Sequence, residues 1–291
     1  MTSFLEVYDC RSGQSRELYR THDSGEVPSL IEAPNWSPDG RFLVFNGGGL
    51  LYRLDLEEGA EPRQIDTGFA VNCNNDHGIS PDGSTLVISD KTETCQSCIY
   101  TLSVEGGTPR RVTENVPSWW HGWSPDGKRL AYTAKRDDEF AIYTIPVEGG
   151  PETRVTDGKG HNDGPDYTPD GEWIWFNSSR GGAMQLWRVR VDGSGLEQMT
   201  DDQRVNWFPH PSPDGRSVLY LSYAPGVEGH PRDHEVELRL MDINGGNART
   251  LVKLFGGQGS INVPCWAPDG SAFAYIRYAR PDEIQRETDN A

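Results

Sequence analysis

The sequence predicts an all-β fold, a six-bladed β-propeller built from four-stranded antiparallel blades. Three observations predict it: a turn motif that recurs six times, strand-like segments after every copy, and the lack of a convincing amphipathic helix. The repeats run through nearly the whole 291-residue chain. We therefore expect residues 1–291 to form a single propeller domain.

The recurring motif reads Ser-Pro-Asp-Gly or a close variant of it. Pro presets φ at the second position of a turn, Asp suits the third, and Gly supplies the positive φ that follows. Successive copies begin 43, 44, 44, 44 and 55 residues apart, which is about the length of one propeller blade. The copies begin at Ser37, Ser80, Ser124, Thr168, Ser212 and Ala267.

The segments after each turn predict the other strands of a blade. The first is a strand-like run such as RFLVF or KRLAYTA, and a second strand follows it, as in FAIYTIPV. A tight turn such as VEGG then leads to a short strand such as TRVT. Together with the strand that enters the turn, this makes four short strands per repeat, the pattern of a propeller blade.

The two ends of the chain are expected to share the last blade. The final repeat supplies only two strands, around Val263–Trp266 and Ser271–Arg277. Two further strand-like segments, FLEVYDC and SRELYRT, lie at the N-terminus. Adding them to the last repeat would close the ring and remove an exposed sheet edge. The charged tail, residues 279–291, is expected to fray.

The composition argues against several classes of partner. A net charge of −17 and a pI near 4.8 disfavour nucleic acids and anionic membranes, because both attract basic surfaces. The start of the chain lacks the features of a secretory signal, which predicts a cytoplasmic protein. Five cysteines do not suggest a disulfide framework, and the isolated Cys95-x-x-Cys98 is read as two ordinary hairpin cysteines.

The turn and the strand after it resemble the TolB-like propellers. Their repeat carries a W-S-P-D-G-x-x-[IL]-x-[FY] core, which is clearest here at Trp36–Phe45 and Trp123–Tyr132. The resemblance covers essentially the whole chain and implies the fold, whereas propellers host many unrelated activities. Prolyl oligopeptidases carry a similar propeller beside a hydrolase domain, but this sequence contains neither that domain nor a G-x-S-x-G motif.

A functional site is expected at the channel mouth opposite the six turns. The segments before the inner strands and the loops between second and third strands should meet there. The seven positions before each turn hold four of the seven histidines. Trp36, Trp123 and Trp266 directly precede turns and are read as core. Trp119, Trp120 and Trp207 lie further upstream and are expected to face the mouth.

These positions predict a pocket for a small polar ligand. Aromatic faces stack on sugar rings, and amide or carboxyl groups bind hydroxyls, so a carbohydrate or an acidic sugar derivative is the favoured ligand. Asn74 and Asp76 lie beside the predicted set. Alternatively, these residues cap the blade tops and hold channel water. The candidate ligand-binding residues are Glu32, Asn75, His77, Trp119, Trp120, His121, His161, Asp163, Arg180, Asn206, Trp207, His210, His230, Gln258 and Asn262.

Cationic residues in the predicted rim loops favour an anionic ligand such as a uronate or a phosphate. They are Lys91, Lys135, Arg136, Arg180, Arg277 and Arg280. The alternative is that the arginine of the Ser178–Gly182 segment is bound within its own blade. The long loop after the second strand of the fifth repeat, which contains His230, is read as a lid or ligand donor.

The clustered histidines leave the question of catalysis open. His121, His161 and His210 could hold one divalent metal ion, with Asp163 as a fourth ligand, although neutral histidines also serve as hydrogen-bonding groups in pockets. In architecture and histidine placement the chain resembles oligogalacturonate lyases, which are cytoplasmic propellers with a metal-containing central site. This resemblance implies a metal-assisted lyase or hydrolase acting on acidic saccharides as the alternative function. A protein-interaction scaffold is the third.

Overall fold

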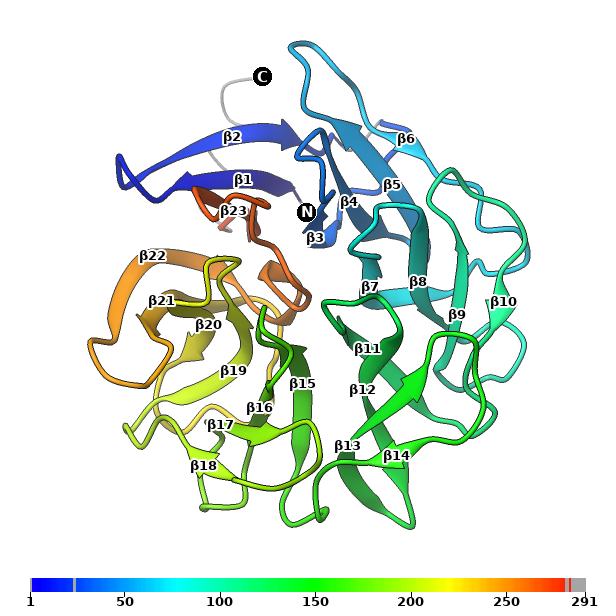
Figure 1. The fold of residues 1–291 in the computed structure, drawn as a ribbon. Coiled ribbons are helices and arrows are strands. Elements are labelled where there is room, and N and C mark those ends of the chain that lie inside the picture. Colours follow the sequence, from blue (N-terminus) through cyan, green and yellow to red (C-terminus); the bar gives the residue numbers. More distant parts are fainter. Residues whose placement is uncertain (1, 23–24, 281–282, 284–291) are drawn as a thin grey trace.

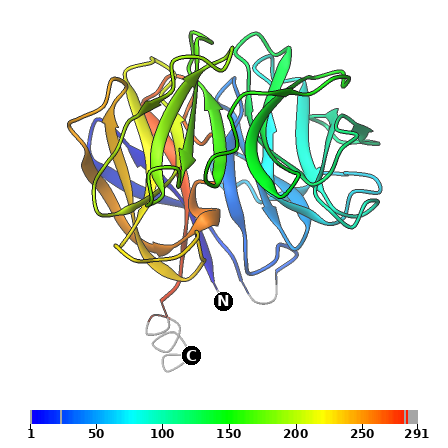
Figure 2. The same ribbon diagram turned by 90° about the horizontal axis from the view of Figure 1, so that it is seen from below.

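The computed structural model describes residues 2–22, 25–280 and 283, whose strands form six blades around a central axis (Figure 1). In the side view the blades stand next to one another, and their strands run between the two faces of the ring (Figure 2). The expected six-bladed, all-β architecture is confirmed. Most of the predicted tail, residues 279–291, lies outside the described residues. Among the described residues, no helix is long and apolar enough to cross a membrane.

Five blades are complete four-stranded antiparallel sheets, in which the strands follow one another from the inner to the outer position. Blade 1 contains β3 (Glu32–Trp36), β4 (Phe42–Gly47), β5 (Leu50–Asp55) and β6 (Arg63–Gln64). Blade 2 contains β7 (Cys73–Ile79), β8 (Thr85–Asp90), β9 (Cys98–Ser103) and β10 (Arg110–Arg111). Blade 3 contains β11 (Ser118–Trp123), β12 (Arg129–Arg136), β13 (Glu139–Pro146) and β14 (Thr153–Arg154). Blade 4 contains β15 (Asn162–Tyr167), β16 (Trp173–Ser178), β17 (Gln185–Arg190) and β18 (Glu197–Gln198). Blade 5 contains β19 (Val205–Pro211), β20 (Ser217–Tyr223), β21 (His234–Asp242) and β22 (Arg249–Gly256).

Both ends of the chain build blade 6, as the sequence predicts. Strand β1 (Ser3–Asp9) lies between β2 (Gln14–Arg20) and β23 (Ala272–Tyr278). The inner position is taken by the short segment that contains Cys265, whose carbonyl accepts a hydrogen bond from Ala274. A short 3₁₀ helix, η1 (Gln258–Ser260), precedes this segment. Across the closure, Arg277 Nε lies 3.1 Å from the carboxylate of Glu6.

The Ser-Pro-Asp-Gly turns form a ring on one face of the propeller. In the first copy the Ser37 hydroxyl donates to Asp39 and accepts from the backbone N–H of Phe42, which locks the turn to the start of β4. Neighbouring turns touch, since a Cβ placed on Gly83 would lie 3.9 Å from Pro38 Cδ of the preceding blade. The loops at the other ends of the inner strands therefore surround the opposite mouth of the channel.

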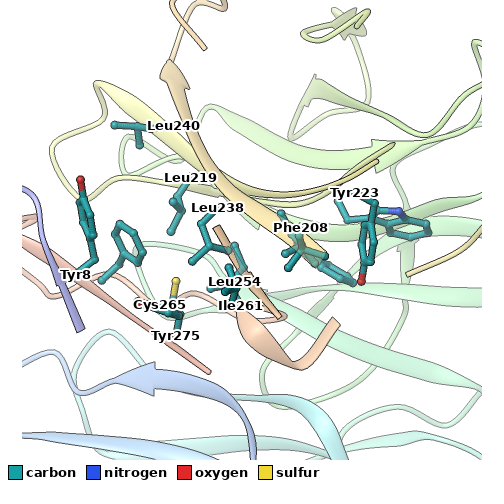
Figure 3. Packing of buried hydrophobic residues seen from close by; sticks show 14 of the residues in the cluster. Tyr8, Phe208, Leu219, Tyr223, Leu238, Leu240, Leu254, Ile261, Cys265 and Tyr275 are labelled. Carbon is teal, nitrogen blue, oxygen red and sulfur yellow. The ribbon is translucent and has the colours of Figure 1, made fainter. Parts of the chain in front are cut away.

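The hydrophobic core lies between neighbouring blades. Figure 3 shows one such cluster, in which side chains from blades 5 and 6 meet, among them Leu219, Leu238 and Tyr275. Tyr8 of β1 stacks on Phe273 of β23, with ring centroids 5.0 Å apart. The tryptophans that directly precede turns pack against these clusters, as expected for core residues.

A bulge recurs in the inner strand of every complete blade. The register of each pair with the second strand shifts three to six residues before the turn. Ala33, Gly164 and Phe208 have positive φ values at three of these bulges, between 51° and 62°. A bulge redirects the side chains around it, so simple alternation does not predict which residues face the channel.

The five cysteines are free thiols. Cys95 is exposed in the loop before β9, whereas Cys98 is buried within that strand, where its Sγ lies 3.3 Å from the carbonyl oxygen of Thr113. The placement agrees with the interpretation of two ordinary hairpin cysteines.

Candidate functional site

A cavity of about 210 Å³ opens among the inner strands of blades 2, 3 and 4, at their ends away from the turns. Strands β12 and β13, the loop between β20 and β21, and the helix η1 complete its walls. Six of the residues predicted for the site line it. The lining residues are Asp76, Trp119, His121, Thr133, Phe140, His161, Asp163, His230 and Gln258.

Asp163 is the residue on which the polar groups of the cavity converge. The Thr133 hydroxyl and the backbone N–H of Gly164 donate hydrogen bonds to its Oδ1, at 2.7 and 2.8 Å. Three imidazoles surround the same carboxylate, with the Nε2 atoms of His121, His161 and His230 at 3.3, 3.7 and 3.9 Å. Strands β11, β12 and β15, the residue that precedes β15 and the blade 5 loop thus contribute to one charged centre.

The ionisation of Asp163 is set by opposing effects. Burial raises the pKa of this carboxyl, but hydrogen bonds and charge interactions with His121 and His161 outweigh burial and hold it well below 3.8. Asp163 is therefore a carboxylate at neutral pH. Burial also lowers the pKa of His121, yet the hydrogen bond to Asp163 and the charges of Asp76 and Asp163 raise it above 6.5 overall.

A second carboxyl group, Asp76, approaches the same nitrogen of His121. Its Oδ1 is 3.9 Å from His121 Nε2 and accepts a hydrogen bond from Asn262 Nδ2 at 2.7 Å. The Asn74 amide donates to Oδ2 at 2.5 Å. Burial outweighs these favourable contacts and raises the pKa of Asp76. Gln258 in turn donates to Asn262 at 3.3 Å, which extends the network to η1.

Aromatic rings form the apolar part of the cavity wall. Trp119 stacks on Phe140 with centroids 5.9 Å apart, and Phe140 stacks on His161 at 4.3 Å. On the other side, His230 packs edge-on against Trp207 at 4.5 Å, which fixes the blade 5 loop on the inner strand below it. The cavity thus combines flat ring faces with a buried carboxylate.

His210 belongs to a separate polar pair inside the channel. Its Nδ1 lies 3.1 Å from Asp166 Oδ2, and its Nε2 lies 2.7 Å from the carbonyl oxygen of Ile261. Both ring nitrogens are thus occupied, and the predicted metal-binding set of His121, His161 and His210 is not assembled. Within residues 2–22, 25–280 and 283, no group of three or more His, Cys, Asp or Glu side chains is placed to hold a metal ion.

Three aromatic or imidazole residues predicted for the site are core residues instead. His77 is fully buried, and Trp120 packs against Gly78 of the neighbouring blade. Trp207 is 2% exposed and belongs to the cluster between blades 5 and 6. These corrections follow from the bulge and from alternation along the strand, which direct Trp119 to the cavity and its neighbour Trp120 away from it.

The remaining predicted residues support the mouth but do not line the cavity. Asn206 is buried and bonded to Ser222 of its own blade, to Asp202 in the preceding loop and to Gln185 of blade 4. The Asn75 carbonyl accepts a hydrogen bond from Asn262. Glu32 accepts one from the Tyr278 hydroxyl at 3.1 Å.

The predicted cationic rim is largely neutralised by acidic partners. Arg180 pairs with Asp157 at 2.7 Å and also contacts Asn162 of its own inner strand. The expectation of an anion-attracting rim is therefore not supported, since paired charges cancel at short range. Further pairs of this kind are Lys135–Asp138 at 2.9 Å, Arg136–Glu152 at 2.9 Å, Arg277–Glu6 at 3.1 Å and Arg280–Glu235 at 2.9 Å.

Sequence reasoning missed Thr133, Phe140 and the channel residue Asp166. Thr133 lies directly opposite Trp119 in the β11–β12 pair, so the hairpin register would have identified it. Phe140 sits at the start of β13, where its apolar character resembles that of any buried strand residue. Asp166 follows the bulge of β15, and its inward direction depends on that register shift.

Comparison with known proteins gives consistent matches to one kind of propeller. Residues 116–230 match the family described as the TolB beta propeller domain. The uncharacterized protein Atu1656 of Agrobacterium fabrum is 56% identical over 278 residues, which cover 96% of this chain and 93% of that protein. A TolB-related structure from Agrobacterium tumefaciens shares 55% identity with a TM-score of 0.92, covering 96% of this chain and 99% of that one.

More distant structures share the fold alone. TolB from Acinetobacter baumannii is 18% identical with a TM-score of 0.66, over 88% of this chain and 64% of that one. An oligogalacturonate lyase in complex with manganese is 15% identical with a TM-score of 0.54, over 77% of this chain and 66% of that one.

Proposed function

We propose that this chain, which belongs to the TolB-like family of β-propellers, binds a small polar molecule in the cavity around Asp163. The observation that carries the proposal is the convergence of three imidazoles and a hydroxyl on one buried carboxylate inside an open cavity. Burying ionisable groups reduces stability unless they are well paired. Such a cluster beside aromatic faces is typical of a ligand site.

A carbohydrate is the ligand class that the cavity walls favour. Trp119 offers a ring face that can stack on the C–H surface of a sugar, and Phe140, which stacks on both Trp119 and His161, supports this ring. Asp163, His161 and Gln258 offer hydrogen-bonding groups for hydroxyls on the same cavity. An acidic sugar derivative is disfavoured, because two carboxyl groups face the cavity and the rim cations are paired with acids.

Two other expectations do not enter this proposal. A metal-assisted lyase or hydrolase would need the metal-binding set that His210 leaves incomplete. A cytoplasmic location, without nucleic-acid or membrane partners, stays a prediction from composition and the N-terminal sequence.

The proposal can be tested by calorimetric titration of the purified protein with a panel of mono- and disaccharides. A saccharide that binds the wild type should bind Trp119→Ala more weakly, because one stacking face is lost. Trp173→Ala is the matched control, since Trp173 packs on Arg188 and Arg190 away from the cavity. Saccharide binding that both variants retain equally would contradict the location, and the absence of any saccharide binding would contradict the ligand class.

A further inference from the structure

We propose that the ligand of this cavity carries a protonated amino group, so that the site takes an amino sugar. This inference rests on the proposed function and makes its ligand class specific. It follows from the charges that face the cavity, from the partners of the surrounding cations, and from the orientation of the aromatic wall.

The charges of the ionisable groups that line the cavity do not cancel, and their sum is negative. Asp163 and Asp76 both face the Nε2 atom of His121, at 3.3 and 3.9 Å. His161 and His230 also face Asp163, so the balance depends on pH. Where these two imidazoles are neutral, protonated His121 compensates one carboxylate but not two. The cost of burying the second charge is reflected in the raised pKa of Asp76. A ligand with one positive charge would neutralise the site.

No lysine or arginine lines the cavity among the residues that the structure describes. The cations nearest to the mouth in sequence are bound to acids: Lys135 Nζ lies 2.9 Å from Asp138, and Arg180 lies 2.7 Å from Asp157. Arg232, in the loop that carries His230, lies 3.2 Å from Asp233. Lys135 Nζ also lies 5.7 Å from the centre of the Phe140 ring, at the edge of the aromatic wall, but its charge is paired with Asp138. None of these three cations is paired with Asp163 or Asp76.

The aromatic wall suits an ammonium group better than it suits an anion. Trp119 and Phe140 are stacked nearly parallel, at 25°, and both line the cavity. Ring faces carry partial negative charge and attract cations within about 6 Å. In protonated His121, Nδ1 carries a hydrogen and has no hydrogen-bond partner, so it can donate to a hydroxyl of the sugar rather than to its amino group. The net charge of −17 would also steer a cation toward the protein.

The test compares four probes by calorimetric titration of the full chain at about pH 7.5, where an ordinary imidazole is mostly neutral: glucosamine, glucose, glucuronate and ethanolamine. We expect glucosamine to bind at least about tenfold more tightly than glucose. Glucuronate should bind most weakly of the three sugars. Raising the salt concentration should weaken the binding of glucosamine more than that of glucose, because screening acts on the charge interaction alone.

Substitutions of single carboxyl groups then test whether the cavity carboxylates select the amine. Asp163→Asn should bring the affinity ratio of glucosamine to glucose close to one, while glucose binding changes less. Glu148→Gln changes the net charge equally at an exposed site and should leave the ratio unchanged. Far-UV circular dichroism checks that each variant is folded. If Asp163→Asn is unfolded, Asp76→Asn replaces it with the same expectation.

The outcomes separate the two proposals. Glucose or glucuronate binding at least as tightly as glucosamine would overturn the inference and leave a sugar site in place. Binding of ethanolamine without any sugar would support the amine and refute the carbohydrate. Binding of none of the four probes would overturn both. An unchanged ratio in the folded Asp163→Asn and Asp76→Asn variants would also overturn the inference.

Discussion

The Nε2 atom of His121 lies 3.3 Å from Oδ1 of Asp163, and this contact joins the inner strands of blades 3 and 4. Both side chains are mostly buried at the wall of the cavity. Within the cavity this contact couples the protonation of His121 to the stability of the propeller and sets the charge that a ligand meets.

The raised pKa of His121 predicts a pH-dependent contribution to stability. The contribution is complete below pH 6.5, the ordinary pKa of histidine, and is lost as the pH rises through the higher pKa of the folded state. We therefore expect the free energies of unfolding of wild type and His121→Asn to differ most at pH 6 and less toward pH 9. Urea unfolding at intermediate pH values measures this difference, and a constant difference would contradict the prediction.

His77 predicts the opposite pH dependence. Burial lowers its pKa to about 4, against the opposing effect of nearby backbone groups of Val44, Ala33 and Asn74. The neutral folded form is favoured above pH 6.5, and stability is lost as the pH falls toward 4, by up to about 3 kcal/mol. His77→Leu should flatten this acid limb in urea unfolding. An acid limb as steep as that of the wild type would refute the assignment.

Alanine variants of three tryptophans should distinguish core residues from a residue that lines the cavity. Trp207 is 2% exposed and Trp123 is 9% exposed, so replacing either with alanine should cost about 3–5 kcal/mol of folding free energy. Trp119→Ala should destabilise the protein clearly less, while weakening ligand binding by about 1.5–3 kcal/mol. Thermal and urea unfolding of the three variants, run together, checks the order. Equal destabilisation by all three would make Trp119 a core residue as well.

Closure of the ring by β1 predicts a large effect of N-terminal truncation. Deleting residues 1–20 removes four buried apolar side chains and exposes the edge of β23. Each such side chain contributes about 1.5–3 kcal/mol, so the loss should exceed about 5 kcal/mol. Thermal unfolding measures it, and a synthetic peptide of residues 1–20 added in trans should restore part of the stability. An unchanged unfolding temperature would disprove closure.

Gly78 leaves room for the buried ring of Trp120. A Cβ at this position would collide with the six-membered part of the indole, so Gly78→Ala should destabilise the protein by about 1–3 kcal/mol. Gly181→Ala is the control, because a Cβ there would meet its neighbours at 3.6 Å or more. Combining Gly78→Ala with Trp120→Phe should cost less than the sum of the two changes, and strict additivity in urea unfolding would argue against the contact.

The sequence by itself determined the blades and their closure. The Ser-Pro-Asp-Gly turn encodes its own geometry within four residues, and the short apolar runs that follow are typical of buried strands. The split last blade follows from counting strands at the two ends. These features depend on neighbouring residues, which is why the predicted ring of six blades agrees with the structure.

Only the tertiary structure decided which side chains form the cavity. Trp119 and Trp120 are adjacent, yet one lines the cavity and the other packs on Gly78, because the bulge and the neighbouring blade determine their directions. His161 reaches Asp163, whereas His210 is held by Asp166. Arg180 is held by Asp157 from the preceding loop. The partners of Trp120, His210 and Arg180 lie in segments distant in sequence, and turn chemistry does not specify those contacts.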